Sequence, residues 1–385
     1  MTYHVVRSSE RLSKRRCRRA WDLRNRQNWR PIVGPQALEF GTAYHAGMQT
    51  IYDPKTWDST TPSQKLALAT DAFVSCCEEQ RDRYLLSTSQ TRLTWAGRDD
   101  YASRTELGKH MLEYYALEVH PTEDVGIRPV KVEQKFSVSL RDADGEPLRC
   151  WNSPKCGQIH ENGSAVVHDG RVDAIFEDIA GGGGYYIVDW KTVGGDKAVD
   201  GTEKNTGRFS QENLVWVHDQ LNTYCWALRL VLNLNVKGFI LAEIRKDYPR
   251  PPALLKHRRN GGIFSTNRNQ STTLSLFEPY VSEHDVEGWH DGAYDEYLEW
   301  LGSREAPIFH KRFRRDKTLK QLQQVGKNLI AEVREMTATD VAIYAEPGEI
   351  TCKFCAFRLP CEMMMHGMEY LPALRAEFEQ RLDDQ

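Results

Sequence analysis

Two short motifs contain the residue types that hydrolysis of a phosphodiester requires. The sequence Asp-Trp-Lys at 189–191 ends the apolar run 185–188, and Gly-Arg-Val-Asp at 170–173 lies upstream of it. Side chains two residues apart lie on the same face of a strand, so Asp189 and Lys191 are expected to share one face. The segment that ends at Asp173 reads as the preceding strand of a hairpin. Two carboxylates and one lysine are therefore predicted to converge.

This set of side chains could support metal-dependent chemistry. Hydrolysis at neutral pH needs a metal ion, an activated water and a cation near the developing negative charge. Asp173 and Asp189 offer hard oxygen ligands for Mg2+ or Mn2+, and Lys191 offers the cation. A structural ion pair between Asp189 and Lys191 is the alternative explanation. The same spacing at 53–55 and at 133–135 is treated as background, because such patterns are common.

Three further polar residues, His45, Gln220 and Tyr224, lie in segments with helical spacing and could belong to the same site. His45 lies in an amphipathic segment, where it could add a nitrogen ligand, although such a histidine is often a surface or core residue. Gln220 and Tyr224 are four residues apart, so they share one face of a helix. Neither feature indicates a function by itself.

Hydrophobic periodicity predicts the elements that would position these residues. Helices are expected at 7–30, 36–51, 62–86, 100–119, 213–233, 284–302 and 316–336. Strands are expected from Val130 onward and at 164–178, 185–190 and 237–245. This order predicts an α/β fold, with helices that flank a central mixed sheet.

Two glycine patterns bear on nucleotide chemistry. The four glycines at 181–184 separate two predicted strands, with no Lys-Ser/Thr after them, so they indicate a hairpin turn rather than a phosphate-binding loop. A GxxxxGK[ST] motif does not occur in the sequence, so the chain has no recognisable ATP motor motif.

Composition and charge restrict the class of protein. The 385 residues are 27% charged and 40% hydrophobic, as in ordinary globular proteins, and the formal net charge is −3. Contact with nucleic acid must therefore depend on local basic patches, of which the densest has ten Arg or Lys between Arg7 and Arg30. The sequence has no apolar run of membrane-spanning length and no secretory signal at its arginine-rich start, which predicts a cytoplasmic protein with no membrane association.

Taken in order, these motifs resemble the RecB-like branch of the PD-(D/E)XK nuclease superfamily. The matching segments are Gly-x-x-x-His at 41–45, Gly-Arg-Val-Asp at 170–173, Val-Asp-Trp-Lys-Thr at 188–192 and Gln-x-x-x-Tyr at 220–224. The resemblance implies a restriction-endonuclease-like core. It also implies a metal and catalytic centre made of His45, Asp173, Asp189, Lys191 and the Trp190 carbonyl, with Gln220 and Tyr224 contacting DNA or supporting the site.

The cysteines extend this resemblance. Cys352, Cys355 and Cys361 lie close together near the C-terminus, and Cys17 lies far upstream. This arrangement resembles the CRISPR-associated RecB-like exonucleases and the AddB nuclease domain, and it implies a [4Fe-4S] cluster that joins 1–35 to 337–385. Zinc held by the same four thiolates is the alternative.

The remaining cysteines suggest one more feature. Cys150 and Cys156 lie within a probable insertion at 145–163, and with His160 or His168 they could bind a zinc ion, although their spacing is looser than in usual zinc knuckles and favours a plain loop. We otherwise interpret 1–385 as a single nuclease domain.

These observations predict a Mg2+- or Mn2+-dependent DNA exonuclease that prefers single-stranded DNA. A structure-specific endonuclease and a catalytically silent DNA-binding or assembly module are the alternatives. The predicted DNA contacts are Arg15, Arg16, Lys246 and Arg312, with Trp29 or Phe313 stacking on bases. A helicase or a CRISPR adaptation complex is a compatible partner by analogy.

Overall fold

The computed structural model describes residues 3–32, 36–87, 95–151, 162–194, 210, 212–303 and 308–380. Its centre is a seven-stranded sheet with the order β1-β5-β6-β7-β10, in which β3 and β4 also pair with β5. The strands are β1 (Tyr3–Arg7), β3 (Ile127–Ser139), β4 (Arg149–Cys150), β5 (Ser164–Asp178), β6 (Tyr185–Val193), β7 (Val236–Arg245) and β10 (His310–Asp316).

The sheet is mixed, as predicted. Strand β6 pairs antiparallel with β5 and parallel with β7, so one crossover connection joins β6 to β7. The glycine turn joins β5 to β6, with positive φ at Gly182, Gly183 and Gly184, which only glycine adopts readily. Residues 186–190 of β6 are all buried because helices cover both faces of the sheet.

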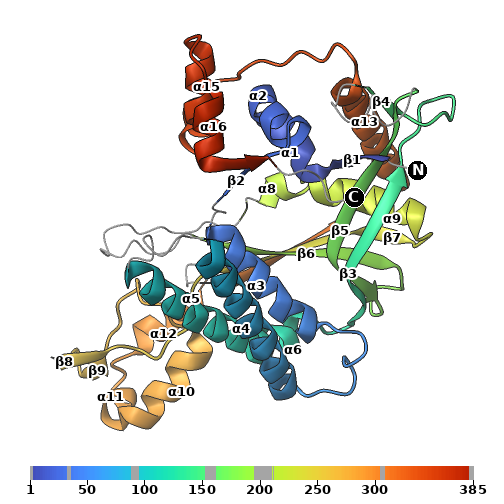
Figure 1. The fold of residues 1–385 in the computed structure, drawn as a ribbon. Helices are drawn as coiled ribbons and strands as arrows, with labels where there is room; N and C mark the ends of the chain where they lie inside the picture. The colour runs from blue at the N-terminus through green and yellow to red at the C-terminus, as the bar shows by residue number, and fades with distance from the viewer. Residues whose placement is uncertain are drawn as a thin grey trace.

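Two layers of helices enclose this sheet (Figure 1). On one face, α9 (Asp219–Val231) and α13 (Leu319–Thr337) pack on residues such as Phe239 and Ile187. On the other face, a helical layer packs on Phe176, Trp190 and Ile240. This layer comprises α3 (Gln36–Ile51), α4 (Pro62–Ser87), α5 (Trp95–Tyr114), the π-helical turn η3 (Tyr115–Val119) and α6 (His120–Glu123).

The predicted N-terminal helix at 7–30 is confirmed only in part, because it is interrupted at Cys17 and the helical structure ends at Arg26. Before it the structure has β1, which pairs parallel with β5 and contains the β-branched residues Val5 and Val6, which suit a strand. Helix α1 (Ser8–Arg16) ends at Cys17, whose backbone is extended with φ −166° and ψ 118°. Short elements follow, namely α2 (Arg18–Trp21), the π-helical turn η1 (Asp22–Arg26) and β2 (Trp29–Pro31).

The two ends of the described chain pack against each other. Strand β2 pairs antiparallel with β11 (Phe378–Gln380), and Leu23 and Trp29 share a hydrophobic cluster with Phe357 and Leu374. The C-terminal helices of this region are α14 (Glu349–Lys353), α15 (Arg358–Met365) and α16 (Leu371–Glu377). Segments more than 300 residues apart in sequence thus form one small unit.

Of the small lobe between β7 and β10, the sequence analysis predicted only a helix at 284–302, where the structure has two short helices. The lobe has its own hydrophobic cluster, which includes Phe264, Phe277 and Tyr294. In Figure 1 it lies beside α5, away from the central sheet. Its elements are β8 (Leu254–Arg259), β9 (Gly262–Phe264), α10 (Leu274–His284), α11 (Val286–His290) and α12 (Asp295–Leu301).

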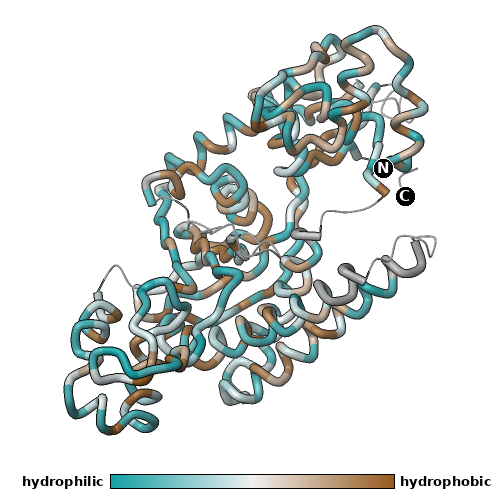
Figure 2. The backbone as a smooth tube through the Cα atoms, turned by 90° about the vertical axis from the view of Figure 1, so that its left-hand side faces the viewer, coloured by the Kyte–Doolittle hydropathy of each residue, from teal (hydrophilic) through white to brown (hydrophobic). Residues whose placement is uncertain are grey.

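Hydrophilic and hydrophobic residues alternate along the helices, as Figure 2 shows. In the part of the chain that the structure describes, no helix is both long enough and apolar enough to cross a membrane. The amphipathic pattern is the one expected of helices that pack one face on a sheet.

Candidate active site

The site lies where β5 and β6 stop pairing. Their antiparallel ladder ends at Ala174 opposite Val188, so the next opposed positions are Asp173 and Asp189. The backbone N–H of Trp190 donates to Oδ2 of Asp173 at 2.8 Å, which fixes this carboxylate beside β6. Both aspartates are more than 90% buried. Two buried carboxylates at neighbouring positions favour the binding of a cation.

Helix α3 brings His45 to these strands. Nδ1 of His45 lies 3.5 Å from Oδ1 of Asp173, and Nε2 lies 2.6 Å from the carbonyl oxygen of Trp190. Burial opposes protonation of His45, but the Asp173 carboxylate outweighs it and raises the pKa of His45. Burial likewise opposes ionisation of Asp173, and the contact with His45 outweighs it, so the pKa of Asp173 is lowered.

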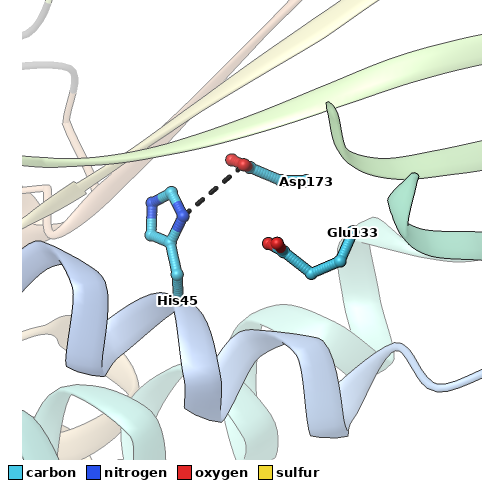
Figure 3. A group of neighbouring side chains, drawn as sticks. All are labelled: His45, Glu133 and Asp173. Carbon is cyan, nitrogen blue, oxygen red and sulfur yellow. Dashed lines mark ion pairs between the residues drawn. The ribbon is translucent and has the colours of Figure 1, made fainter. Parts of the chain in front are cut away.

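Glu133 is a member of the site that the sequence analysis missed. Figure 3 shows its carboxylate beside His45 and Asp173, and one ligand atom of each residue lies within 4.8 Å of the others. Within the described ranges this is the one group of three or more His, Cys, Asp or Glu residues whose ligand atoms lie so close together. The Glu-x-Lys pattern at 133–135, treated above as background, was the available signal.

The backbone of Glu133 explains its orientation. Its φ is +50°, in the left-handed region, at a point where β3 pairs through Val132 and Gln134 but not through Glu133. The side chain is held by Gln49 Nε2 at 2.8 Å and by Arg171 Nε at 2.7 Å. Burial raises the pKa of Glu133, and the nearby Arg171 opposes that shift. A strained backbone at this position indicates that the direction of this carboxylate matters.

Lys191 lies beside Asp189, as their spacing predicted. Its Nζ is 3.0 Å from Oδ1 and 2.9 Å from Oδ2 of Asp189. Burial and the charge of Asp173 raise the pKa of Asp189, and Lys191 opposes that shift. The pKa of Lys191 is itself raised, because the two aspartates outweigh burial. This ammonium therefore remains charged at neutral pH.

One pocket of about 940 Å³ is lined by His45, Asp173, Asp189 and Lys191, and also by Gln220 and Tyr224 of α9. Glu133 is not part of this lining. Nε2 of Gln220 donates to the Tyr224 hydroxyl at 3.2 Å. The lining also includes Arg7, Lys135 and Arg171, which are exposed. Sequence analysis did not bring these three cations together, because they come from separate strands. The pocket thus combines acidic groups at its base with cations at its rim.

None of the four predicted DNA contacts lines this pocket. Arg15 forms ion pairs with Asp219 and Glu332, and Arg16 is exposed on α1. The ammonium of Lys246 lies 5.3 Å from the centre of the Phe40 ring.

The structure gives Arg312, Trp29 and Phe313 interior roles instead of DNA contacts. Arg312 donates to Asp124 at 2.5 Å, and to the hydroxyls of Tyr52 and Tyr115, in the interior of the helical layer. Trp29 and Phe313 are 7% and 2% exposed, so neither ring is available for stacking on a base.

The four cysteines singled out in the sequence line a second cavity of about 170 Å³. Cys17 follows α1, Cys352 and Cys355 lie in and just after α14, and Cys361 lies on α15. Burial raises the pKa values of Cys355 and Cys361, and neighbouring thiols of the group add to this shift. Across the described residues, no three cysteine sulfur atoms lie within 4.8 Å of one another.

The second cysteine pair is only partly described. Cys156 and His160 lie outside the described residues. Cys150 is buried on β4, and Nδ1 of His168 donates to the carbonyl oxygen of Val6 at 2.9 Å. In the structure His168 therefore ties β1 to β5.

Comparison with known proteins agrees with the geometry of the site. A family model described as the PD-(D/E)XK nuclease superfamily matches residues 11–362, which is most of the chain and includes every residue of the centre. No curated protein matches the chain. Enzymes of this superfamily cleave nucleic acids with the help of divalent metal ions, which agrees with the group formed by His45, Glu133 and Asp173. The chain belongs to the PD-(D/E)XK nuclease superfamily.

Proposed function

We propose that this protein is a Mg2+- or Mn2+-dependent deoxyribonuclease whose centre contains His45, Glu133, Asp173, Asp189 and Lys191. The observation that carries the proposal is the approach of His45, Glu133 and Asp173 to within 4.8 Å of one another. Lys191 and Asp189 line the same pocket as His45 and Asp173. A purely structural ion pair at 189–191 would not require an imidazole and two further carboxylates beside it.

The ligands of the metal would be His45, Glu133 and Asp173, with Asp189 and the Trp190 carbonyl as further oxygen donors. When bound, the ion would neutralise phosphate charge and activate a water molecule for attack. Carboxylate and carbonyl oxygens suit Mg2+ and Mn2+, while an imidazole nitrogen suits transition metals better than Mg2+. We therefore expect Mn2+ to support faster cleavage than Mg2+.

The other residues of the pocket would position the substrate. Lys191, held by Asp189 at 2.9 Å, would place a positive charge beside the phosphate during cleavage. Arg7, Lys135 and Arg171 on the rim would contact neighbouring phosphates of the backbone. Gln220 and Tyr224 would contact the strand or support the base of the pocket.

Cleavage from an end and a preference for single strands are part of the proposal, and they derive from the resemblance to RecB-like exonucleases. The test compares linear and circular single-stranded DNA of the same sequence with Mn2+. Degradation of the linear strand alone supports an exonuclease, whereas cutting of the circle as well supports the endonuclease alternative. Binding of both without any cutting supports the silent module. A helicase or CRISPR adaptation partner would supply DNA ends, and stimulation of cleavage by such a partner would test that assignment.

We also propose that Cys17, Cys352, Cys355 and Cys361 hold a [4Fe-4S] cluster that links the two ends of the chain. Their position around one cavity supports this proposal. A tetrahedral zinc site places its sulfur atoms about 4 Å apart, whereas no three cysteine sulfur atoms of the described chain lie within 4.8 Å of one another. A cluster holds its four thiolates farther apart than a single ion does.

The cluster is tested by the composition of anaerobically purified protein. Iron and sulfide near four of each per chain, with broad visible absorbance, would support the assignment. A colourless protein with one zinc per chain would contradict it and favour the zinc alternative.

A further inference from the structure

The small lobe between β7 and β10 has a marked separation of charge. Its helical part, 274–301, contains eight Asp or Glu and no Lys or Arg. The segment that leads from the sheet into the hairpin, 245–259, contains six Lys or Arg and one Asp. An acidic surface repels DNA and a basic one attracts it. Only the hairpin side of the lobe is therefore suited to contact a phosphate backbone.

The hairpin formed by β8 and β9 is firmly attached to the lobe. Its turn is at Asn260 and Gly261, with φ +48° and +86°, as in the tight turns that suit twisted hairpins. Arg258 forms ion pairs with Asp285 and Glu287 at 3.5 and 2.6 Å. The hydroxyl of Tyr294 accepts hydrogen bonds from two backbone N–H groups of β9. The hairpin therefore has a fixed orientation.

Three basic side chains of this hairpin point to solvent. Lys256, His257 and Arg259 are exposed, and in the described part of the chain only Arg258 of this strand takes part in an ion pair. In Figure 1 the hairpin projects outward beyond the helices of the lobe. Lys256 and Arg259 have no acidic partner among the described residues, so on this projecting hairpin they retain their attraction for an anionic polymer.

The lobe begins near the candidate active site. Val193 pairs with Arg245 at the end of the parallel strands, two residues beyond Lys191. The next residue, Lys246, lies 5.3 Å from the ring of Phe40 on α3. Phe40 and His45 are five residues apart, a rise of about 7.5 Å along the helix. A strand that leaves the centre past the start of α3 would therefore pass Lys246 and continue toward the hairpin.

We infer that the β8–β9 hairpin is a second DNA contact, which binds the phosphate backbone of a strand outside the active site through Lys256, His257 and Arg259. This inference rests on the proposed nuclease function. The hairpin would act only on substrates long enough to reach it. Short substrates would bind at the pocket alone.

The test replaces the three side chains together, as Lys256→Gln, His257→Gln and Arg259→Gln, and leaves the anchoring Arg258 intact. On single-stranded DNA of about 30 nucleotides the KM for cleavage should rise about tenfold with kcat unchanged, whereas on DNA of about four nucleotides KM should not change. The slope of the logarithm of the binding constant for the long strand against the logarithm of the salt concentration should become shallower by about 1.4, because two lysine or arginine contacts are lost.

A matched control removes two exposed cations of α13, as Lys327→Gln and Arg334→Gln, and should change neither quantity. An unchanged KM and an unchanged salt slope in the hairpin variant would overturn the inference. That result would favour an acidic protein as the partner of the hairpin. Equal losses on both DNA lengths would also overturn it. The binding titration does not depend on cleavage, so inactivity of the wild type would contradict the proposed function and not this inference.

Discussion

Asp173 and Asp189 occupy the first opposed positions beyond the end of the β5–β6 ladder. Like charges at opposed positions destabilise a pair of strands, so the two strands part where their carboxylates would meet. The space that results contains His45 and Lys191, and the ammonium of Lys191 offsets the repulsion. The same electrostatics that end the ladder thus create a pocket that favours a divalent cation.

Asp189 and Lys191 should affect stability and cleavage differently. Asp189→Asn removes a buried charge whose pKa is raised by burial and by Asp173, so the midpoint of urea unfolding should stay the same or rise. Lys191→Met leaves that carboxylate without its partner, so the midpoint should fall. Both variants should lose at least about 100-fold in kcat.

The surface variant Asp340→Asn is the control for both measurements and should match the wild type. Near-normal cleavage by either active-site variant would show that the replaced residue is not part of the catalytic centre.

Glu133 offers a test of backbone strain. Because its φ is +50°, glycine should suit this position better than alanine, the reverse of the usual order in a strand. We expect Glu133→Gly to be more stable than Glu133→Ala by about 1 kcal/mol. Both should lose metal affinity and cleavage to the same degree.

Urea unfolding and Mn2+ titration of the two variants give these quantities. An alanine variant more stable than the glycine variant would contradict the left-handed conformation of Glu133.

His168 should make stability fall in mild acid. It is fully buried, and burial lowers its pKa from 6.5 to about 4. As the pH falls below 6.5 the unfolded chain takes up a proton at this residue that the folded chain does not. The stabilising contribution is therefore complete above pH 6.5 and is lost progressively between 6.5 and 4. It should amount to about 2 kcal/mol between pH 7 and pH 5.

His168→Gln keeps a side-chain donor for the Val6 carbonyl but does not titrate in this range. Urea unfolding of the two proteins should show a smaller pH dependence in the variant. Parallel curves would mean that the folded protein takes up a proton at His168 as readily as the unfolded chain, and would contradict the lowered pKa.

Loss of one predicted cluster ligand should loosen the packing between the two ends of the chain. Cys355→Ser should lower the iron content. It should also increase proteolysis within β2 and β11, because these two strands pair with each other where the two ends of the described chain meet. Cys76→Ser, on α4, is the matched cysteine control and should change neither quantity. Equal iron content in the two variants would exclude Cys355 as a ligand.

The sequence was most informative where local pattern and burial agree. The apolar run before Asp189, the glycine turn and helix α3 were predicted with nearly their observed bounds, because each has a strong periodicity or turn signal. The order of the motifs also indicated the PD-(D/E)XK nuclease superfamily correctly.

Other features depend on contacts between distant segments. Arg312 lies in a basic run that resembles a DNA contact, but its partner Asp124 is 188 residues away, and only the folded chain shows that the pair is buried. Glu133 has a common Glu-x-Lys pattern, and its importance follows from a positive φ that no local signal indicates. Strand β1 was not predicted, because its partner strand β5 lies more than 150 residues away in the sequence.

The central claim is tested most directly by incubating end-labelled single-stranded DNA with Mn2+, with Mg2+ or with EDTA. The wild type, Asp173→Asn and Asp340→Asn should be compared under identical conditions. We predict that the wild type and Asp340→Asn cleave with either metal, faster with Mn2+, and that EDTA or Asp173→Asn abolishes cleavage. Cleavage that persists in EDTA, or in Asp173→Asn at the wild-type rate, would contradict a metal centre at the junction of β5 and β6.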